Sequence, residues 1–150
     1  MKLFLGGTCT SNWRNDLIPL LENNGIDYFN PIVDDWNEEA QKIEYEEKNI
    51  CSHLLYVITP SMEGVFSIAE IVDDSNKRPD KTIFVYMDKE LDNPNIIFSD
   101  SQLKSLGAVE SMVKNNGAFT YKASTIEDLF SFIKSINDDT RDIDKELNND

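Results

Sequence analysis

Residues 53–72, HLLYVITPSMEGVFSIAEIV, join a nearly continuous apolar run to a polar loop and a second apolar segment. The first run, 53–59, is typical of a central strand in a parallel sheet that helices cover on both faces. The second segment predicts a helix over 64–74. A buried strand that passes through a short loop into a helix is half of a βαβ unit, so this region indicates an α/β protein.

The same alternation continues on both sides of this region. It predicts strands at 2–5, 26–30, 53–59, 81–87 and 118–121, and helices at 13–24, 36–50, 64–74, 101–116 and 125–136. Strands and helices that alternate in this way form a parallel sheet through right-handed crossovers, with helices in a layer on each face. We therefore expect a doubly wound three-layer sandwich with strand order 2-1-3-4-5. Its ligand crevice should lie outside the carboxyl ends of strands 1 and 3.

The 150 residues are enough for one domain, which we assign to residues 1–136. Residues 137–150 contain six acidic and two basic residues, and their only aliphatic residues are Ile143 and Leu147. This composition predicts a frayed or disordered acidic tail. The alternative is a helix that docks on a neighbouring subunit.

The net charge of −14 comes from 28 acidic and 14 basic residues. It argues against a nucleic-acid polymer or an anionic membrane as the partner, because both attract basic surfaces. No apolar run reaches the roughly 18 residues that a membrane span needs. The apolar start is too short for a signal peptide. With Cys9 and Cys51 expected to be reduced, we predict a cytoplasmic protein.

Several common catalytic groups are missing from the sequence. The single histidine, His53, begins the central strand at the end opposite the crevice, so a histidine-based triad has no base. There is no Cys-x-x-Cys motif or His/Cys cluster, and we expect no metal. The first loop, 6–12, reads GGTCTSN and lacks both the dinucleotide glycine pattern and the P-loop lysine. We expect no cofactor, although this loop can still hold a phosphate on its backbone N–H groups.

The remaining chemistry falls to carboxylates. In the predicted helix 64–74, Ser67 and Glu70 are polar residues three positions apart in an apolar setting, so they share a face. The helix begins at the crevice, where a partly desolvated carboxylate suits a nucleophile. The alternative is that Ser67, Glu70 and Asp74 form the solvated stripe of an amphipathic helix.

Two further groups have two interpretations each. Asp34, Asp35 and Trp36 follow the second strand at the crevice rim, where they can contact a ligand or serve as a solvated helix cap with an anchoring tryptophan. Trp13, just after the first loop, can stack on a base or anchor the first helix in the core. Asn12 is expected to cap that helix.

The sequence resembles the nucleoside 2-deoxyribosyltransferase superfamily, including its nucleotide N-hydrolase branch. The resemblance rests on 2–8 (KLFLGGT), 53–60 and 64–70 (GVFSIAE), and it covers residues 1–87 with a continuation to 136. It implies a flavodoxin-like fold and cleavage of an N-glycosidic bond. Glu70 would attack the anomeric carbon and form a sugar ester, which a second base or water then resolves, as in retaining glycosidases.

The resemblance also implies a substrate site. Loops 6–12 and 61–64 would hold the sugar, residues 34–36 the base, and Glu44 matches an acidic residue of the family's second helix. The predicted substrate-binding residues are Gly6, Gly7, Thr8, Asn12, Trp13, Asp34, Asp35, Trp36, Glu44, Ser61, Gly64 and Ser67. The expected substrate is a nucleoside or nucleoside monophosphate, since Arg14 is the main basic residue nearby. Family members assemble as dimers or larger, so we expect a homo-oligomer.

The sequence departs from the family pattern at three places. Ser52 replaces an acidic residue of the family, Gly64 replaces an acidic or seryl residue, and Ile71-Val72 replaces Leu-Gly after the catalytic glutamate. These changes keep three alternatives open. The protein can be a diverged module that binds nucleotides without turnover, a Toll/interleukin-receptor type glycohydrolase of a dinucleotide, or an acidic scaffold that uses its tail to bind a protein.

Overall fold

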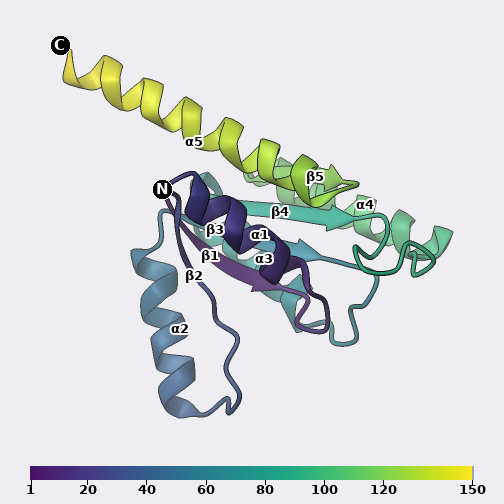
Figure 1. The fold of residues 1–150 in the computed structure, drawn as a ribbon. Helices are drawn as coiled ribbons and strands as arrows, with labels where there is room; N and C mark the ends of the chain where they lie inside the picture. Colours follow the sequence, from purple (N-terminus) through teal and green to yellow (C-terminus); the bar gives the residue numbers. More distant parts are fainter. Residues whose placement is uncertain (150) are drawn as a thin grey trace.

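The structure is a computed structural model that describes residues 1–149, and five parallel strands form its central sheet (Figure 1). The strands are β1 (Lys2–Gly7), β2 (Asp27–Phe29), β3 (His53–Ile58), β4 (Thr82–Met87) and β5 (Phe119–Ala123). Their order is β2-β1-β3-β4-β5, and every neighbouring pair is parallel. The predicted α/β fold and strand order are confirmed.

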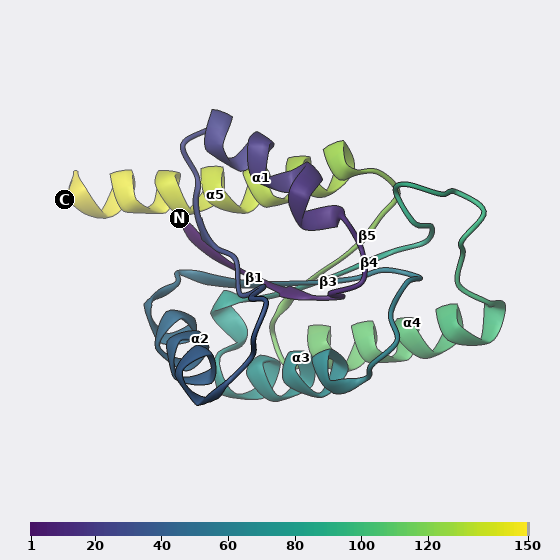
Figure 2. The same ribbon diagram turned by 60° about the horizontal axis from the view of Figure 1, so that its bottom comes forward.

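Helices cover both faces of this sheet. They are α1 (Trp13–Asn23), α2 (Glu38–Ile50), α3 (Phe66–Lys77), α4 (Asp100–Asn115) and α5 (Ile126–Asn148), with a short 3-10 turn, η1 (Pro79–Lys81). Figure 2 shows α1 and α5 on one face and α2, α3 and α4 on the other, which is the expected three-layer arrangement. None of the helices within residues 1–149 is both long and apolar enough to cross a membrane.

The alternation of side chains along the strands separates two cores. Leu3, Leu5 and Val57 belong to the core beneath α1 and α5. Phe4 and Tyr56 belong to the core on the other face, beside α3. β3 and β4 are buried at every position because both faces are covered, as the apolar run of 53–59 predicts. The candidate site lies next to this second core, and Phe4 belongs to both.

The carboxyl end of β1 depends on a glycine. Gly7 has φ +111°, and a Cβ atom there would lie 2.1 Å from the carbonyl oxygen of Val57. A side chain is therefore excluded both by the backbone conformation and by the close approach of β3. This geometry lets the chain leave the sheet at once and start α1.

The ends of some helices differ from the predictions. Asn12 precedes α1, but its side chain makes no capping hydrogen bond and instead donates to Asp92. α2 starts at Glu38, later than predicted, because the Asn37 side chain accepts a hydrogen bond from the Ala40 N–H. Trp36 consequently lies in the loop before α2.

The prediction of a disordered tail is wrong for residues 137–148. These residues continue α5, which runs without interruption from Ile126 to Asn148 and extends away from the sheet (Figure 1). This stretch contains no glycine or proline that would end a helix, and the hydroxyl of Thr125 caps the amino end. Residue 150, the last of the predicted tail, lies outside the described residues.

Candidate active site

A cavity of about 360 Å³ lies beside the carboxyl end of β1, at the end of the sheet where the crevice was expected. Its wall is built from β1, the start of α1, helices α2 and α3, and the loop that follows β2. The residues that line it are Phe4, Gly6, Gly7, Cys9, Arg14, Pro31, Ile32, Val33, Trp36, Glu44 and Glu70. The cavity therefore lies on the side of β1 that faces the loop after β2, whereas the topology predicted a crevice between strands 1 and 3.

Glu70 is the carboxylate that α3 contributes to this cavity. It lies in the second turn of the helix, next to Ile71, which is fully buried in the core. Burial of Ile71 orients the helix so that the Glu70 side chain faces α2, where it is 25% exposed. Its Oε2 atom accepts a hydrogen bond from Lys48 Nζ at 2.6 Å. Its Oε1 atom has no hydrogen-bond partner within residues 1–149.

Lys48 of α2 was not identified from the sequence. Its side chain is 16% exposed, and its ammonium lies 2.6 Å from Glu70 and 3.5 Å from Asp74 Oδ2. The same nitrogen stands 5.5 Å from the ring centre of Phe4 and 5.6 Å from that of Tyr56. No local pattern signals this contact, because it depends on how α2 packs against α3.

Asp74 lies one turn beyond Glu70 and is only 2% exposed. It accepts hydrogen bonds from the Tyr56 hydroxyl and from Arg78 Nε, the latter at 3.0 Å. Burial, followed by the charge of Asp74, raises the pKa of Tyr56 far above its ordinary value. The interpretation of 67–74 as a solvated stripe is thus wrong for Asp74, which is a buried anchor of α3.

The buried guanidinium of Arg14 binds the backbone at the end of β1 and in the first loop. It donates to the carbonyl oxygens of Leu5 at 2.9 Å and Thr8 at 2.7 Å, and more weakly to that of Gly7 at 3.3 Å. Burial lowers the pKa of Arg14 to about 10. Arg14 therefore serves mainly to hold the backbone of the loop, although it reaches the cavity wall.

Trp13 does not reach the cavity, so the prediction that it binds substrate is wrong. Its side chain is fully buried in the core beneath α1, and its indole N–H donates to the Thr8 carbonyl at 2.9 Å. The Arg14 guanidinium covers the ring, 4.4 Å from its centre. A base cannot stack on a ring enclosed in this way, and the alternative of a core anchor is the observed one.

The part of the cavity wall that the loop after β2 forms carries an exposed aromatic side chain. Trp36 is 59% exposed, and its indole N–H donates to Glu44 Oε2 at 3.2 Å. Ile32 and Val33 lie in the same loop and are about half exposed. This part of the wall therefore offers exposed apolar side chains with the Glu44 carboxylate beside them.

The other predicted substrate residues lie elsewhere. Thr8 and Gly64 line a second cavity of about 240 Å³, which shares Cys9 with the first. Ser61 donates its hydroxyl to Glu90, and Asn12 is bound to Asp92. The remaining three, which line neither cavity, are Asp34, Asp35 and Ser67.

Glu90 is a second buried carboxylate that sequence reasoning missed. Three hydroxyl groups donate to it, those of Ser11 at 2.7 Å, Thr59 at 2.8 Å and Ser61 at 2.6 Å. Burial acts to raise the pKa of Glu90, but these bonds and the Leu91 N–H outweigh it, so the pKa lies below its ordinary value. Glu90 thus ties together the loops that follow β1, β3 and β4.

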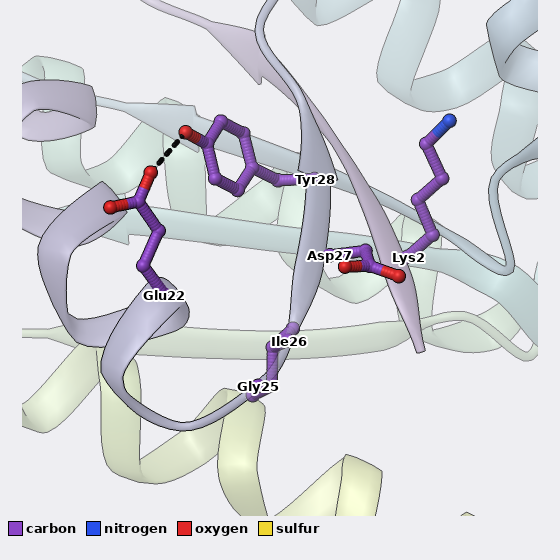
Figure 3. Close-up of a pocket in the computed structure, with 6 residues that line it drawn as sticks. All are labelled: Lys2, Glu22, Gly25, Ile26, Asp27 and Tyr28. Carbon is purple, nitrogen blue, oxygen red and sulfur yellow. Dashed lines mark hydrogen bonds between the residues drawn. The ribbon is translucent and has the colours of Figure 1, made fainter.

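A cavity of about 490 Å³ lies at the other end of the sheet, near the amino ends of β1 and β2 (Figure 3). Three of its polar side chains are engaged, since Tyr28 donates to Glu22 at 2.7 Å and Lys2 pairs with Glu47, which lies outside the cavity, at 2.8 Å. No predicted site residue lies there. Among residues 1–149, no group of three or more His, Cys, Asp or Glu side chains is placed to hold a metal ion.

A family model described as nucleoside 2-deoxyribosyltransferase like matches residues 1–89. The chain belongs to this family. The match to the nucleoside 2-deoxyribosyltransferase-like family extends from β1 through β4 and includes every residue that lines the 360 Å³ cavity. A search of curated proteins and a search of solved structures found no match.

Proposed function

We propose that this protein cleaves the N-glycosidic bond of a nucleoside and transfers the 2-deoxyribosyl group to another base or to water. The observation that carries the proposal is the position of Glu70. It stands on the wall of a cavity at the carboxyl end of β1, with one carboxylate oxygen held by Lys48 and the other without a hydrogen-bond partner among residues 1–149.

In the proposed reaction, Glu70 Oε1 bonds to the anomeric carbon of the sugar as the base leaves. The resulting ester is then resolved by an acceptor base or by water, which restores the carboxylate. The exposed ring of Trp36 and the neighbouring Ile32 and Val33 suit the flat face of a base. Gly6 and Gly7 line the part of the cavity at the carboxyl end of β1, where the sugar would lie against their backbone.

The charges of the cavity favour a nucleoside over its monophosphate. Two carboxylates, Glu44 and Glu70, are in the wall, and the one cation among the residues that line it, Arg14, donates to backbone carbonyl oxygens. A phosphate placed here would meet negative charge without a free cation. A 2′-deoxynucleoside should therefore be cleaved faster than its 5′-monophosphate.

The test is to incubate the protein with a panel of ribo- and 2′-deoxynucleosides and their 5′-monophosphates, with and without an acceptor base. Released and exchanged bases are measured by chromatography. Glu70→Gln should lower base release by roughly a thousandfold or more, since it removes the nucleophile. Asp73→Asn is the matched control, because Asp73 is in the same helix but is 58% exposed and pairs with Lys77. Equal activity of Glu70→Gln and the wild-type protein would contradict the proposal.

A second candidate is a module that binds nucleosides without turnover. The ion pair of Glu70 with Lys48 favours it. A carboxylate whose charge is balanced by an ammonium is a weaker nucleophile, yet it can still accept a hydrogen bond from a sugar hydroxyl. This candidate predicts ligand binding by calorimetry with no base release from any member of the panel. Homo-oligomer formation and a cytoplasmic location stay predictions. Light scattering can test the first, because it measures the mass of the particle in solution.

A further inference from the structure

Lys48 connects two carboxylates on successive turns of α3. Its ammonium lies 2.6 Å from Glu70 Oε2 and 3.5 Å from Asp74 Oδ2, and the side chain is 16% exposed. We propose that Lys48 is a positioning residue that accelerates the release of the sugar from Glu70, an inference that rests on the proposed function.

Neighbouring groups fix the ammonium from several sides. The rings of Phe4 and Tyr56 lie beneath it, and Asp74 is itself held by Tyr56 and Arg78. The backbone of this last turn of α2 is fixed as well, because Lys81 Nζ donates to the Lys48 carbonyl oxygen at 2.9 Å and to that of Cys51 at 3.0 Å. Lys48 is thus held in place before any substrate binds.

The contact selects which oxygen of Glu70 reacts. Lys48 binds Oε2, whereas Oε1 has no partner within the part of the chain that the structure describes. In the first step, a bond forms between Oε1 and the anomeric carbon while the bond from that carbon to the base nitrogen breaks. The electron pair goes to the base, which takes a proton from solvent. Oε2 then becomes the carbonyl oxygen of the ester, still beside Lys48.

In the second step, a lone pair of the acceptor nitrogen or water oxygen bonds to the anomeric carbon. The bond from Oε1 to that carbon breaks, its electron pair returns to the carboxylate of Glu70, and the acceptor loses its proton to solvent. Negative charge reappears on the carboxylate in this step, and a preorganised ammonium stabilises it as it forms. In the first step, the same ammonium stabilises the attacking carboxylate, so it gives no comparable acceleration there.

Lys48→Met tests this role, because it keeps the length and apolar stem of the side chain and removes the charge. Base release from a 2′-deoxynucleoside is followed on the millisecond-to-second scale without acceptor base, and the enzyme is analysed by intact mass. We expect a burst of base close to one per enzyme, an accumulated sugar ester, and a steady rate lower by roughly a hundredfold. Lys48→Arg should restore turnover and remove the burst.

Lys42→Met is the matched control, because Lys42 is on the same helix, is 75% exposed and pairs only distantly with Glu46, at 4.0 Å. It should keep wild-type kinetics. Lys48→Gln replaces the methionine variant if the latter does not fold. A wild-type protein that releases base, combined with neutral Lys48 variants that show neither burst nor ester, would overturn the role of Lys48 alone. Absence of base release by the wild-type protein would overturn the proposed function itself.

Discussion

The hydroxyl of Tyr56 in β3 donates a hydrogen bond to the carboxylate of Asp74 in α3, and both side chains are buried. This contact attaches α3 to the sheet one turn after Glu70. Because Asp74 also binds Arg78 and lies 3.5 Å from Lys48, the anchor that fixes the helix also fixes the ion pair of the candidate nucleophile.

Tyr56→Phe should lower the free energy of unfolding by about 1–3 kcal/mol, because it leaves a buried carboxylate without one of its donors. The loss should shrink at high pH. The raised pKa of Tyr56 keeps its proton on in the folded state, whereas the unfolded chain loses it near pH 10, so wild-type stability falls as pH rises through that value.

Urea unfolding at pH 8 and pH 10.5 measures both effects. Tyr45→Phe is the control, because Tyr45 is 68% exposed on α2, and its stability should follow the wild-type curve at both pH values. A Tyr56→Phe protein with the same decline above pH 10 as the wild type would contradict the assigned pKa shift.

Two glycines should respond oppositely to alanine. Gly7→Ala would place a Cβ atom 2.1 Å from the Val57 carbonyl oxygen at φ +111°, and we expect the variant not to fold. At Gly107, in the middle of α4, the added atom would meet nothing within 4 Å. Gly107→Ala should raise the free energy of unfolding by about 0.5–1 kcal/mol through helix propensity. Circular dichroism and thermal unfolding compare the two, and a well-folded Gly7→Ala protein would refute the geometry of β1.

The fold was largely predictable because its determinants are local. The apolar run at 53–59 and the alternation of strands and helices around it are enough to predict the parallel sheet and its order. The end of α5 was not predictable from composition. Acidic residues indicated disorder, yet the absence of helix breakers lets the helix continue to Asn148.

The candidate site was predictable only in part. The position of Glu70 beside the cavity could be predicted, because its helix leads directly from the central strand. Lys48 was missed because it lies 22 positions away and meets Glu70 only through the packing of α2 against α3. Trp13 was wrongly assigned because a tryptophan at the start of a helix fits a core as well as a surface, and only tertiary burial distinguishes the two.

His53 should make stability depend on pH below neutrality. Burial, more than the nearby positive charges, lowers its pKa, so the folded protein holds it neutral while the unfolded chain takes up a proton. Stability should therefore fall as pH drops below about 6.5, by at most about 1.4 kcal/mol per pH unit. His53 is the only histidine, so His53→Gln should flatten the curve between pH 5.5 and 6.5. An unchanged slope in the variant, measured by urea unfolding, would contradict the prediction.

Glu90 gives a second pH test, at more acidic pH and at the end of the sheet that carries the candidate site. Its lowered pKa means that its contribution to stability is present above about pH 4.5 and is lost as pH falls through the folded value. Glu90→Gln replaces one acceptor oxygen with a donor, so we expect a loss of about 2–3 kcal/mol at pH 7 and a flatter decline below pH 4.5.

The structural consequence of Glu90→Gln should appear in the loops that Glu90 connects. Ser11 is 79 positions from Glu90, so this hydrogen bond ties the first loop to a distant segment of the chain, in addition to the local hydrogen bonds that Arg14 makes to the loop backbone. Amide hydrogen exchange should become faster around Ser11 and Ser61 while the amides of β3 stay protected. Glu146→Gln, an exposed position in α5, is the control and should change neither the exchange nor the acid slope. Loops that exchange at the wild-type rate in Glu90→Gln would show that their order depends on other contacts, such as those of Arg14.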